Sequence, residues 1–255
     1  MYVEEPHARA PSGSAKGPRL TLDKVGVRLD AIEVLRDVSC QFRERRIAIV
    51  GRNGSGKTTL ARVIAGLQTP TTGSAKIDGA DMARDRKAAL SNVGILFQNP
   101  EHQIIFPTVT EEIAFGLVQQ GHTREVAARL TRDMLKRFGK SDWEEAVTHQ
   151  LSQGQKQLVC LMAVLAMQPK LIVLDEPYSG LDIPTRMQLM RYVDGIDANI
   201  VQITHDPDTV AHFDRIVWLD KGAVRMDGPA TEVRPAFERA MQDWGRGDDL
   251  TDLTS

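Results

Sequence analysis

The chain has 255 residues, of which 42% are hydrophobic and 26% are charged, and its formal net charge is −2. This length allows one α/β domain, or one core with a small subdomain. The balance of 32 Lys and Arg against 34 Asp and Glu argues against nucleic acid as the main partner. No apolar run reaches the length of a membrane span and no secretory leader is evident, so we expect a cytosolic protein.

The first half of the chain predicts a tail followed by strands. Residues 1–17 are rich in Pro, Gly, Ala and Ser and predict a disordered tail. Alternating or continuous apolar patterns then predict five strands: Arg19–Val27, Val38–Phe42, Arg46–Val50, Gly73–Asp78 and Asn92–Phe97. The helical spacing of Lys57–Gly66 predicts a helix directly after the third of them. Cys40 and Cys160 lie far apart without metal-ligand spacing, and we expect both to be reduced thiols in the core.

The second half predicts helices first and a return to strands later. Residues from about 101 to 165 read as a helical subdomain inserted into an α/β domain over residues 18–230. Its helices are predicted at Glu111–Val118, Val126–Phe138 and Gln153–Met167, the last capped by Ser152. Buried strands follow at Leu171–Leu174 and Ile200–Ile203, then a hairpin of Arg215–Leu219 and Ala223–Met226. Residues 231–255 predict a C-terminal helix, from about Glu232, and a polar tail.

A glycine-rich loop between the strand Arg46–Val50 and the following helix predicts phosphate binding. The segment Gly51-Arg-Asn-Gly-Ser-Gly-Lys-Thr58 matches G-x-x-x-x-G-K-[ST] at every fixed position. Glycines let the backbone amides surround an anion, while Lys57 supplies a positive charge and the Thr58 hydroxyl is a ligand for Mg²⁺. The candidate nucleotide-binding residues are Gly51, Arg52, Asn53, Gly54, Ser55, Gly56, Lys57, Thr58 and Thr59.

Two adjacent carboxylates end the apolar strand Leu171–Leu174. The carboxyl ends of parallel strands line the ligand crevice of an α/β sheet, so Asp175 and Glu176 are expected beside the phosphates. Asp175 is predicted to hold Mg²⁺, directly or through water, and Glu176 to polarise an attacking water.

Further motifs resemble those of the ATP-binding-cassette (ABC) ATPases, in the order that this family has them. Leu151-Ser-Gln-Gly-Gln155 resembles the L-S-G-G-Q signature, and Ser179-Gly-Leu-Asp182 resembles the D-loop. Gln98 follows a strand as the Q-loop glutamine does, and His205 follows another as the switch histidine does. The resemblance implies an α/β fold of the P-loop NTPase class. It consists of an ABC nucleotide-binding domain with a RecA-like core, an N-terminal antiparallel β part and an inserted helical subdomain.

The resemblance also implies a mechanism. In ABC ATPases two domains pack head to tail, and each ATP lies between the phosphate loop of one and the signature of the other. Glu176 and His205 are then the catalytic residues, and Thr58, Gln98 and Asp175 are the expected Mg²⁺ ligands. Gln98 and Asp182 are expected in coupling and in dimer contacts. The signature residues expected to face the partner's ATP are Ser152, Gln153, Gly154 and Gln155.

Two positions depart from the family pattern. Gln153 replaces the first glycine of the signature, which leaves the rate of hydrolysis open. Leu29 stands where the family often has an aromatic residue that stacks on adenine. Apolar packing on the base by Leu29, or stacking by another residue, are the alternatives.

The block Phe97-Gln-Asn-Pro-Glu-His-Gln103 resembles the ATPases of energy-coupling factor (ECF) importers. That resemblance implies a peripheral protein at the cytoplasmic face of the cell membrane, with a transmembrane coupling subunit and a substrate-binding membrane subunit as partners. The second ATPase is either another copy or a paralogue. The biotin-type branch is favoured over the cobalt or nickel branch. The alternative is an ABC ATPase without transport, such as an assembly-scaffold or remodelling ATPase.

The apolar residues that follow this block suggest a contact surface. Ile104, Ile105, Phe106 and Val109 would form a docking patch for the coupling subunit if they are exposed, or part of the subdomain core if they are buried.

Overall fold

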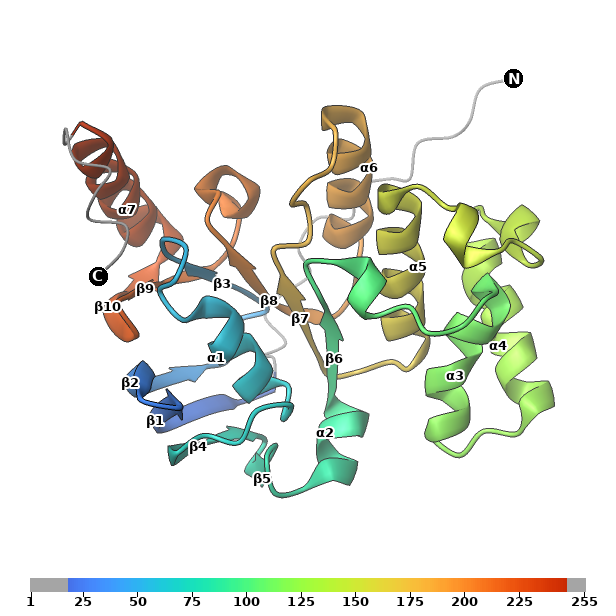
Figure 1. The fold of residues 1–255 in the computed structure, drawn as a ribbon, viewed down its shortest axis with the longest axis horizontal. Helices are drawn as coiled ribbons and strands as arrows, with labels where there is room; N and C mark the ends of the chain where they lie inside the picture. The colour runs from blue at the N-terminus through green and yellow to red at the C-terminus, as the bar shows by residue number, and fades with distance from the viewer. Residues whose placement is uncertain (1–17, 247–255) are drawn as a thin grey trace.

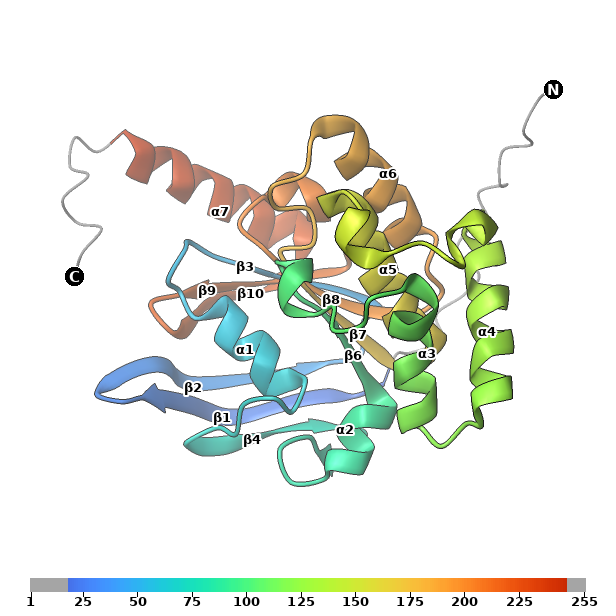
Figure 2. The same ribbon diagram turned by 45° about the vertical axis from the view of Figure 1, so that its right-hand side comes forward.

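The computed structural model of this protein describes residues 18–246, so the tail predicted for residues 1–17 and the last residues, 247–255, lie outside the described part. Two sheets form the body of the molecule, and helix α1 (Lys57–Ile64) lies between them (Figure 1). A group of helices lies at one end of the molecule and α7 (Ala230–Gly245) at the other, as both views show (Figures 1 and 2). This arrangement is the predicted α/β fold. Every helix within residues 18–246 is too short or too polar to span a lipid bilayer.

The smaller sheet is antiparallel, and a bulge keeps its apolar side chains on one face. Its strand order is β2–β1–β4–β5, and the strands are β1 (Leu20–Leu29), β2 (Ile32–Phe42), β4 (Thr72–Ile77) and β5 (Ala80–Asp81). In β1 the buried side chains change from Leu20 and Leu22 to Val25 and Val27, a shift from even to odd positions. The pairing with β2 shifts between Leu22 and Val25, where Lys24 has a φ of 48°. The extra residue turns both pairs toward the core.

Strand β2 is longer than predicted. It begins at Ile32, whereas the apolar pattern indicated a strand only from Val38 to Phe42. Its first half exposes Ile32 and Glu33, so its sequence shows little alternation, and pairing with β1 makes it a strand.

The larger sheet brings the carboxyl ends of its central strands side by side. Its order is β10–β9–β3–β8–β7–β6, and all neighbouring pairs are parallel except β10 and β9. The strands are β3 (Arg46–Val50), β6 (Val93–Leu96), β7 (Leu171–Asp175), β8 (Asn199–Thr204), β9 (Arg215–Asp220) and β10 (Ala223–Pro229). Val50 lies opposite Thr204, and Asp175 lies opposite Ile203. The residues that follow these strands therefore emerge side by side.

Two apolar clusters fix this sheet from both sides. Ile47 and Ile49 of β3 pack with α1 and the smaller sheet, while Ala48 and Val50 pack with the helices on the other face. This alternation follows from the two-residue period of a strand and explains why the central strands are apolar throughout. Cys40 and Cys160 are free thiols inside these clusters, as predicted.

Within residues 18–246, six further α-helices surround the sheets: α2 (Arg86–Asn92), α3 (Val109–Gln119), α4 (Arg124–Arg137), α5 (Gln153–Ala166), α6 (Ile183–Asp194) and α7. Helices α3, α4 and α5 contact one another beside the larger sheet (Figure 2). The sequence pattern did not predict α2 or α6. Helix α6 buries only Leu189 and Val193 and exposes Ile183 and Met187, so its apolar residues do not form one stripe.

We expect Gly94→Ala to lower the free energy of unfolding by about 1–3 kcal/mol, because it overpacks a tight contact between β6 and α5. A Cβ at Gly94 would lie 2.3 Å from Cγ1 of Val164 and 3.1 Å from Cγ of Pro169. Denaturant unfolding measures the change. Gly245→Ala is the control, because a Cβ there would meet no atom within 4 Å. Equal stability of both variants would contradict this packing argument.

Candidate active site

The phosphate loop follows β3 and requires glycine at two positions for steric reasons. A Cβ at Gly51 would lie 2.3 Å from the carbonyl oxygen of Leu219. Gly56 has a φ of 97°, and a Cβ there would lie 2.7 Å from Leu35 Cδ2 and 2.9 Å from the carbonyl oxygen of Val34. Gly56 is also the N-cap of α1 without a side-chain cap, so the first amides of that helix remain available to an anion.

Lys57 lies folded back along this loop. Its Nζ donates hydrogen bonds to the carbonyl oxygens of Gly51 at 2.8 Å and Arg52 at 2.9 Å, and the residue is only 6% exposed. Burial lowers the pKa of the Lys57 ammonium, and the nearby carboxylates of Glu176 and Asp175 oppose that shift. The two hydrogen bonds hold the Lys57 amine within the phosphate loop.

The side chains of Thr58 and Asp175 bring two potential Mg²⁺ ligands together beside the phosphate loop. The Thr58 hydroxyl donates a hydrogen bond of 3.2 Å to Oδ1 of Asp175, which is 2% exposed. Burial raises the pKa of the Asp175 carboxyl, and the hydrogen bond from Thr58 partly offsets the rise. A hydroxyl and a carboxylate are the hard ligands that Mg²⁺ prefers, so the pair fits such an ion. Gln98 donates instead to Ser179 Oγ at 3.2 Å, and no hydrogen bond within residues 18–246 joins it to Thr58 or Asp175.

The catalytic pair predicted from the sequence is in contact. Nδ1 of His205 lies 2.8 Å from Oε1 of Glu176, and Glu176 is 8% exposed. An ionised carboxylate can only accept a hydrogen bond, so an ionised Glu176 accepts one from an N–H at Nδ1 of His205. Glu176 has a φ of 48°, a conformation that non-glycine residues rarely adopt, and its N–H donates to the carbonyl oxygen of Ile203. The structure thus holds this carboxylate in a strained, partly enclosed position.

The signature segment forms the start of α5. Ser152 and Gln155 make a capping box, in which Ser152 Oγ accepts from the Gln155 N–H and Gln155 Oε1 accepts from the Ser152 N–H. A Cβ at Gly154 would lie 2.1 Å from Cγ2 of Thr185, so a larger residue here would displace the Thr185 side chain. Gln153 is the residue that departs from the signature pattern, and its side-chain amide packs over Gly180 of the D-loop. A Cβ at Gly180 would lie 3.1 Å from Nε2 of Gln153.

Asp182 ends the D-loop as the N-cap of α6. Its carboxylate accepts a hydrogen bond of 2.8 Å from the Thr185 N–H, which holds the pKa of Asp182 below its ordinary value. The predicted dimer contact of Asp182 involves a second chain and stays a prediction.

Several residues near this site carried no sequence signal. The Arg52 guanidinium lies 5.2 Å from the ring centre of Trp244 in α7. Gln157 of α5 donates to the carbonyl oxygen of Phe97 at 3.1 Å and so ties the signature helix to the segment before Gln98. Arg186 of α6 pairs with Asp206, next to His205. No predicted motif contains Trp244, Gln157 or Arg186, because each acts through a partner distant in the sequence.

The apolar patch predicted at residues 104–109 is divided by the fold. Val109 is fully buried and Ile104 packs against the core, so for these residues the docking reading is wrong. The side chains of Ile105 (65% exposed) and Phe115 lie at the surface. The ring centre of Phe106 lies 5.0 Å from the ring centre of Phe115. The loop is held by Glu112, whose Oε2 accepts from the N–H groups of Ile105 and Phe106 at 2.9 Å.

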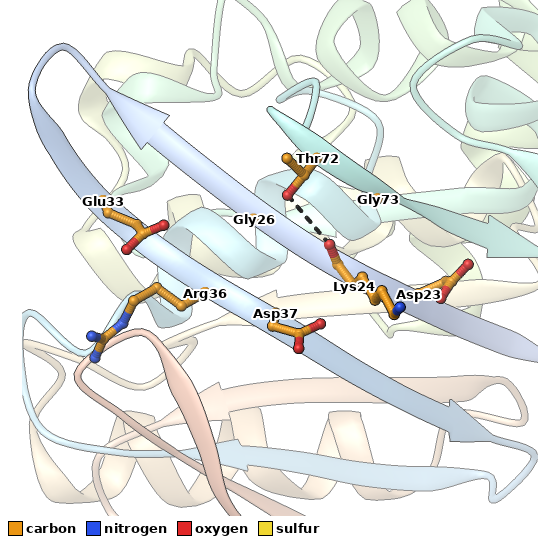
Figure 3. A pocket seen from close by; sticks show the side chains of 8 residues that line it. All are labelled: Asp23, Lys24, Gly26, Glu33, Arg36, Asp37, Thr72 and Gly73. Atoms are coloured by element: carbon orange, nitrogen blue, oxygen red, sulfur yellow. Dashed lines mark hydrogen bonds between the residues drawn. The ribbon is translucent and has the colours of Figure 1, made fainter.

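The described surface includes a smaller and a larger hollow. One of about 200 Å³ is lined by Glu176, His205, Arg186 and the D-loop. The other, of about 510 Å³, lies on the exposed face of the smaller sheet and is lined by charged residues of both signs, including Lys24, Arg36 and Asp37 (Figure 3). None of the predicted site residues lines this larger groove. The smaller hollow is lined by the predicted catalytic residues Glu176 and His205.

The chain is similar in sequence to proteins of one known family. The family model described as "ABC transporter" matches residues 35–179. The chain is 47% identical to the biotin transport ATP-binding protein BioM of Rhodobacter capsulatus, over 88% of this chain and 95% of that protein. It is 38% identical to the energy-coupling factor transporter ATP-binding protein EcfA of Methanosphaera stadtmanae, over 80% of this chain and 76% of that protein.

Two solved structures share the fold. CbiO1 of Clostridium perfringens, part of the ABC transporter complex CbiONQ, superposes with a TM-score of 0.74 at 28% identity, covering 89% of this chain and 94% of that one. A dimeric ATP-binding cassette in a post-hydrolysis state, bound to ADP and Pi, superposes with a TM-score of 0.72 at 25% identity, covering 83% and 98%.

We expect Asp175→Asn to stabilise the nucleotide-free protein at neutral pH, as measured by its thermal midpoint. Burial raises the pKa of Asp175, so the unfolded chain releases this proton at lower pH than the folded one. The free energy of unfolding therefore falls as pH rises through the window between the two pKa values, and the loss persists above it. Asn removes the titration, so the gain should be largest at neutral pH and vanish in acid. A gain independent of pH would contradict this origin.

Proposed function

We propose, because this chain belongs to the ABC transporter family of ATPases, that it powers an importer of the energy-coupling factor type by hydrolysing ATP in a head-to-tail dimer. The observation that carries the proposal is the Glu176–His205 contact at the edge where the phosphate loop also begins. The similarity to biotin and energy-coupling factor transport proteins supports the type of importer.

Binding of ATP follows from the phosphate loop. The loop amides and the N-terminus of α1 offer donors and a positive dipole to the phosphates, and Lys57 adds a full charge. To reach a phosphate, the Lys57 ammonium exchanges its carbonyl partners for phosphate oxygens. Its low exposure keeps that interaction out of bulk water, where it would be weaker.

Hydrolysis uses the carboxylate of Glu176. Water attacks the γ-phosphorus, the bond from that phosphorus to the ADP oxygen breaks, and Glu176 accepts a proton from the water. His205 orients the Glu176 carboxylate through the contact at 2.8 Å. Thr58 and Asp175 would hold Mg²⁺, which supplies charge stabilisation to the phosphates when it is bound.

The signature segment completes a site on the second chain. The capping box at Ser152 sets the first turn of α5, whose free amides and dipole favour an anion. Gly154 lets α5 approach α6 closely, so the signature and the D-loop form one surface toward the partner. A second copy of this chain has both halves of the composite site and is sufficient, and a paralogue is the other candidate.

We expect Glu176→Gln to lower ATP turnover on the order of a hundredfold or more and to trap an ATP-bound dimer, because the amide cannot take the proton. Phosphate release measures turnover, and size-exclusion chromatography with ATP measures the dimer. The matched control is Glu145→Gln, at an exposed position of the helical region. Normal hydrolysis by Glu176→Gln would remove Glu176 from the proposed mechanism.

The loop at Ile105 and Phe106 is the proposed contact with the membrane subunit. Glu112 and the Thr148 hydroxyl, which donates to the carbonyl oxygen of Phe106 at 2.8 Å, hold this loop from below. Apolar side chains presented on a rigid loop are suited to a coupling helix. The loop follows Gln98, which lies against the D-loop, so a contact there is close to the ATP site. These features support a peripheral position at the cytoplasmic face of the membrane.

For the cargo, we favour biotin over cobalt or nickel ions. The support is the similarity to biotin transport ATP-binding proteins of Rhodobacter capsulatus and Rhizobium etli. The ATPase does not itself contact the cargo in this arrangement, so the identity of the membrane partner tests the assignment.

We expect Ile105→Asp to reduce recovery of membrane partners by at least about tenfold in a pull-down from detergent-solubilised membranes, because it places a charge in an apolar interface. Mass spectrometry identifies the partners. Leu67→Asp is the control, since Leu67 is exposed to a similar degree (57%) away from this loop. Recovery of a transmembrane coupling subunit with a biotin-binding membrane protein by the wild type would support the proposal.

Two results would contradict it. Equal losses from both variants would exclude the loop at Ile105 as the contact. Recovery of soluble partners alone, with a control transporter intact in the same detergent, would favour an ABC ATPase that does not transport.

A further inference from the structure

An ion pair next to the catalytic pair joins α6 to the turn after β8. The Arg186 guanidinium donates a hydrogen bond of 2.5 Å to Oδ2 of Asp206. The two side chains are 36% and 30% exposed, and Arg186 lines the same hollow as Glu176 and His205. The sequence motifs assign no role to Arg186.

Asp206 controls the backbone on the carboxyl side of His205. Its Oδ1 accepts from the Asp208 N–H at 3.1 Å, and its own N–H donates to Thr204 Oγ1 at 3.0 Å. His205 thus stands between two residues that are bonded to each other. Because Oδ2 of Asp206 is bound to Arg186, the position of this turn depends on α6 as well as on β8.

At its other end, Arg186 is tied to the D-loop. Its N–H donates to the carbonyl oxygen of Asp182, the N-cap of α6, within the first turn of that helix. Thr185, the preceding residue, touches Gly154 of the signature segment. A first helical turn has little freedom once it is capped, so a shift of the D-loop also moves the Arg186 guanidinium.

We propose that Arg186 is a positioning residue for hydrolysis: through Asp206 it holds His205 against Glu176 and passes the position of the D-loop to that pair. This inference rests on the proposed head-to-tail dimer, in which the D-loop and signature contact the partner. Docking of the partner then orients His205 in the chain whose D-loop it contacts. Arg186 positions His205 through Asp206 and does not itself contact ATP.

The alternative is that the ion pair only supports the local fold. A positioning role and a structural role predict different effects of substituting Arg186. A positioning residue affects the chemical step and leaves ATP binding and dimerisation intact, whereas a structural residue affects the stability of the whole site. A lysine at position 186 keeps the charge and can still reach Asp206, so it should keep the positioning function in part.

The test measures steady-state ATPase rates of Arg186→Ala and Arg186→Lys, with Arg191→Ala as the control on the same helix. Arg191 is exposed and lies in the last turn of α6, away from the hollow. We expect Arg186→Ala to lower kcat about tenfold or more with KM for ATP within about twofold, because misplacement of a catalytic group costs rate and not binding. Arg186→Lys should recover most of kcat, and Arg191→Ala should match the wild type.

A second measurement separates this inference from the proposed function. The double variant Glu176→Gln with Arg186→Ala should form as much ATP-bound dimer as Glu176→Gln alone. If Glu176→Gln alone forms no dimer, the proposed function fails. If it does, but the double variant does not, Arg186 supports dimerisation and the positioning role is wrong. A wild-type kcat for Arg186→Ala, or no recovery with lysine, would also overturn it.

Discussion

The register of three parallel strands is the constraint on which the site depends. Val50 of β3 lies opposite Thr204 of β8, and Asp175 of β7 lies opposite Ile203. The backbone hydrogen bonds of these ladders bring the phosphate loop, Glu176 and His205 to one edge, although they are far apart in the sequence. Apolar clusters on both faces of the sheet hold the register, because a slip of one residue would exchange the faces of every side chain.

The carboxyl ends of these strands carry buried charges and a strained backbone conformation that do not contribute to the stability of the core. Lys57, Asp175 and Glu176 are all buried, and Glu176 has a positive φ. Burial lowers the pKa of Lys57 and raises the pKa of Asp175, so it favours the neutral form of each side chain. In the absence of nucleotide such features lower stability. A polyanion with a cation would complement them. The site is therefore organised for binding at the expense of the stability of the empty protein.

The second functional surface is built from helices and not from strand ends. The capped start of α5, the D-loop and the first turn of α6 touch one another through Gly154, Thr185 and Gly180. Arg186 and Asp206 connect this group to His205, and Gln157 connects it to the segment before Gln98. In the proposed head-to-tail dimer, each protomer would contribute both surfaces to ATP hydrolysis, and these contacts within the chain connect the two surfaces. The exposed loop at Ile105 lies beyond this segment, held by buried Glu112.

The sequence by itself determined the parts that depend on local backbone demands. The phosphate loop, the strand that ends at Asp175 and the cap at Ser152 each follow from residue types at fixed spacing. The pairing of Glu176 with His205 was implied by the resemblance to the ABC ATPases. Only the tertiary structure decided the rest. It buried Val109 and exposed Ile105, formed α6 from a sequence without an apolar stripe, and packed Gln153 over Gly180. It also paired Arg186 with Asp206. The physical reason is that a side chain's burial and its partners are set by elements distant in the sequence, which no local pattern encodes.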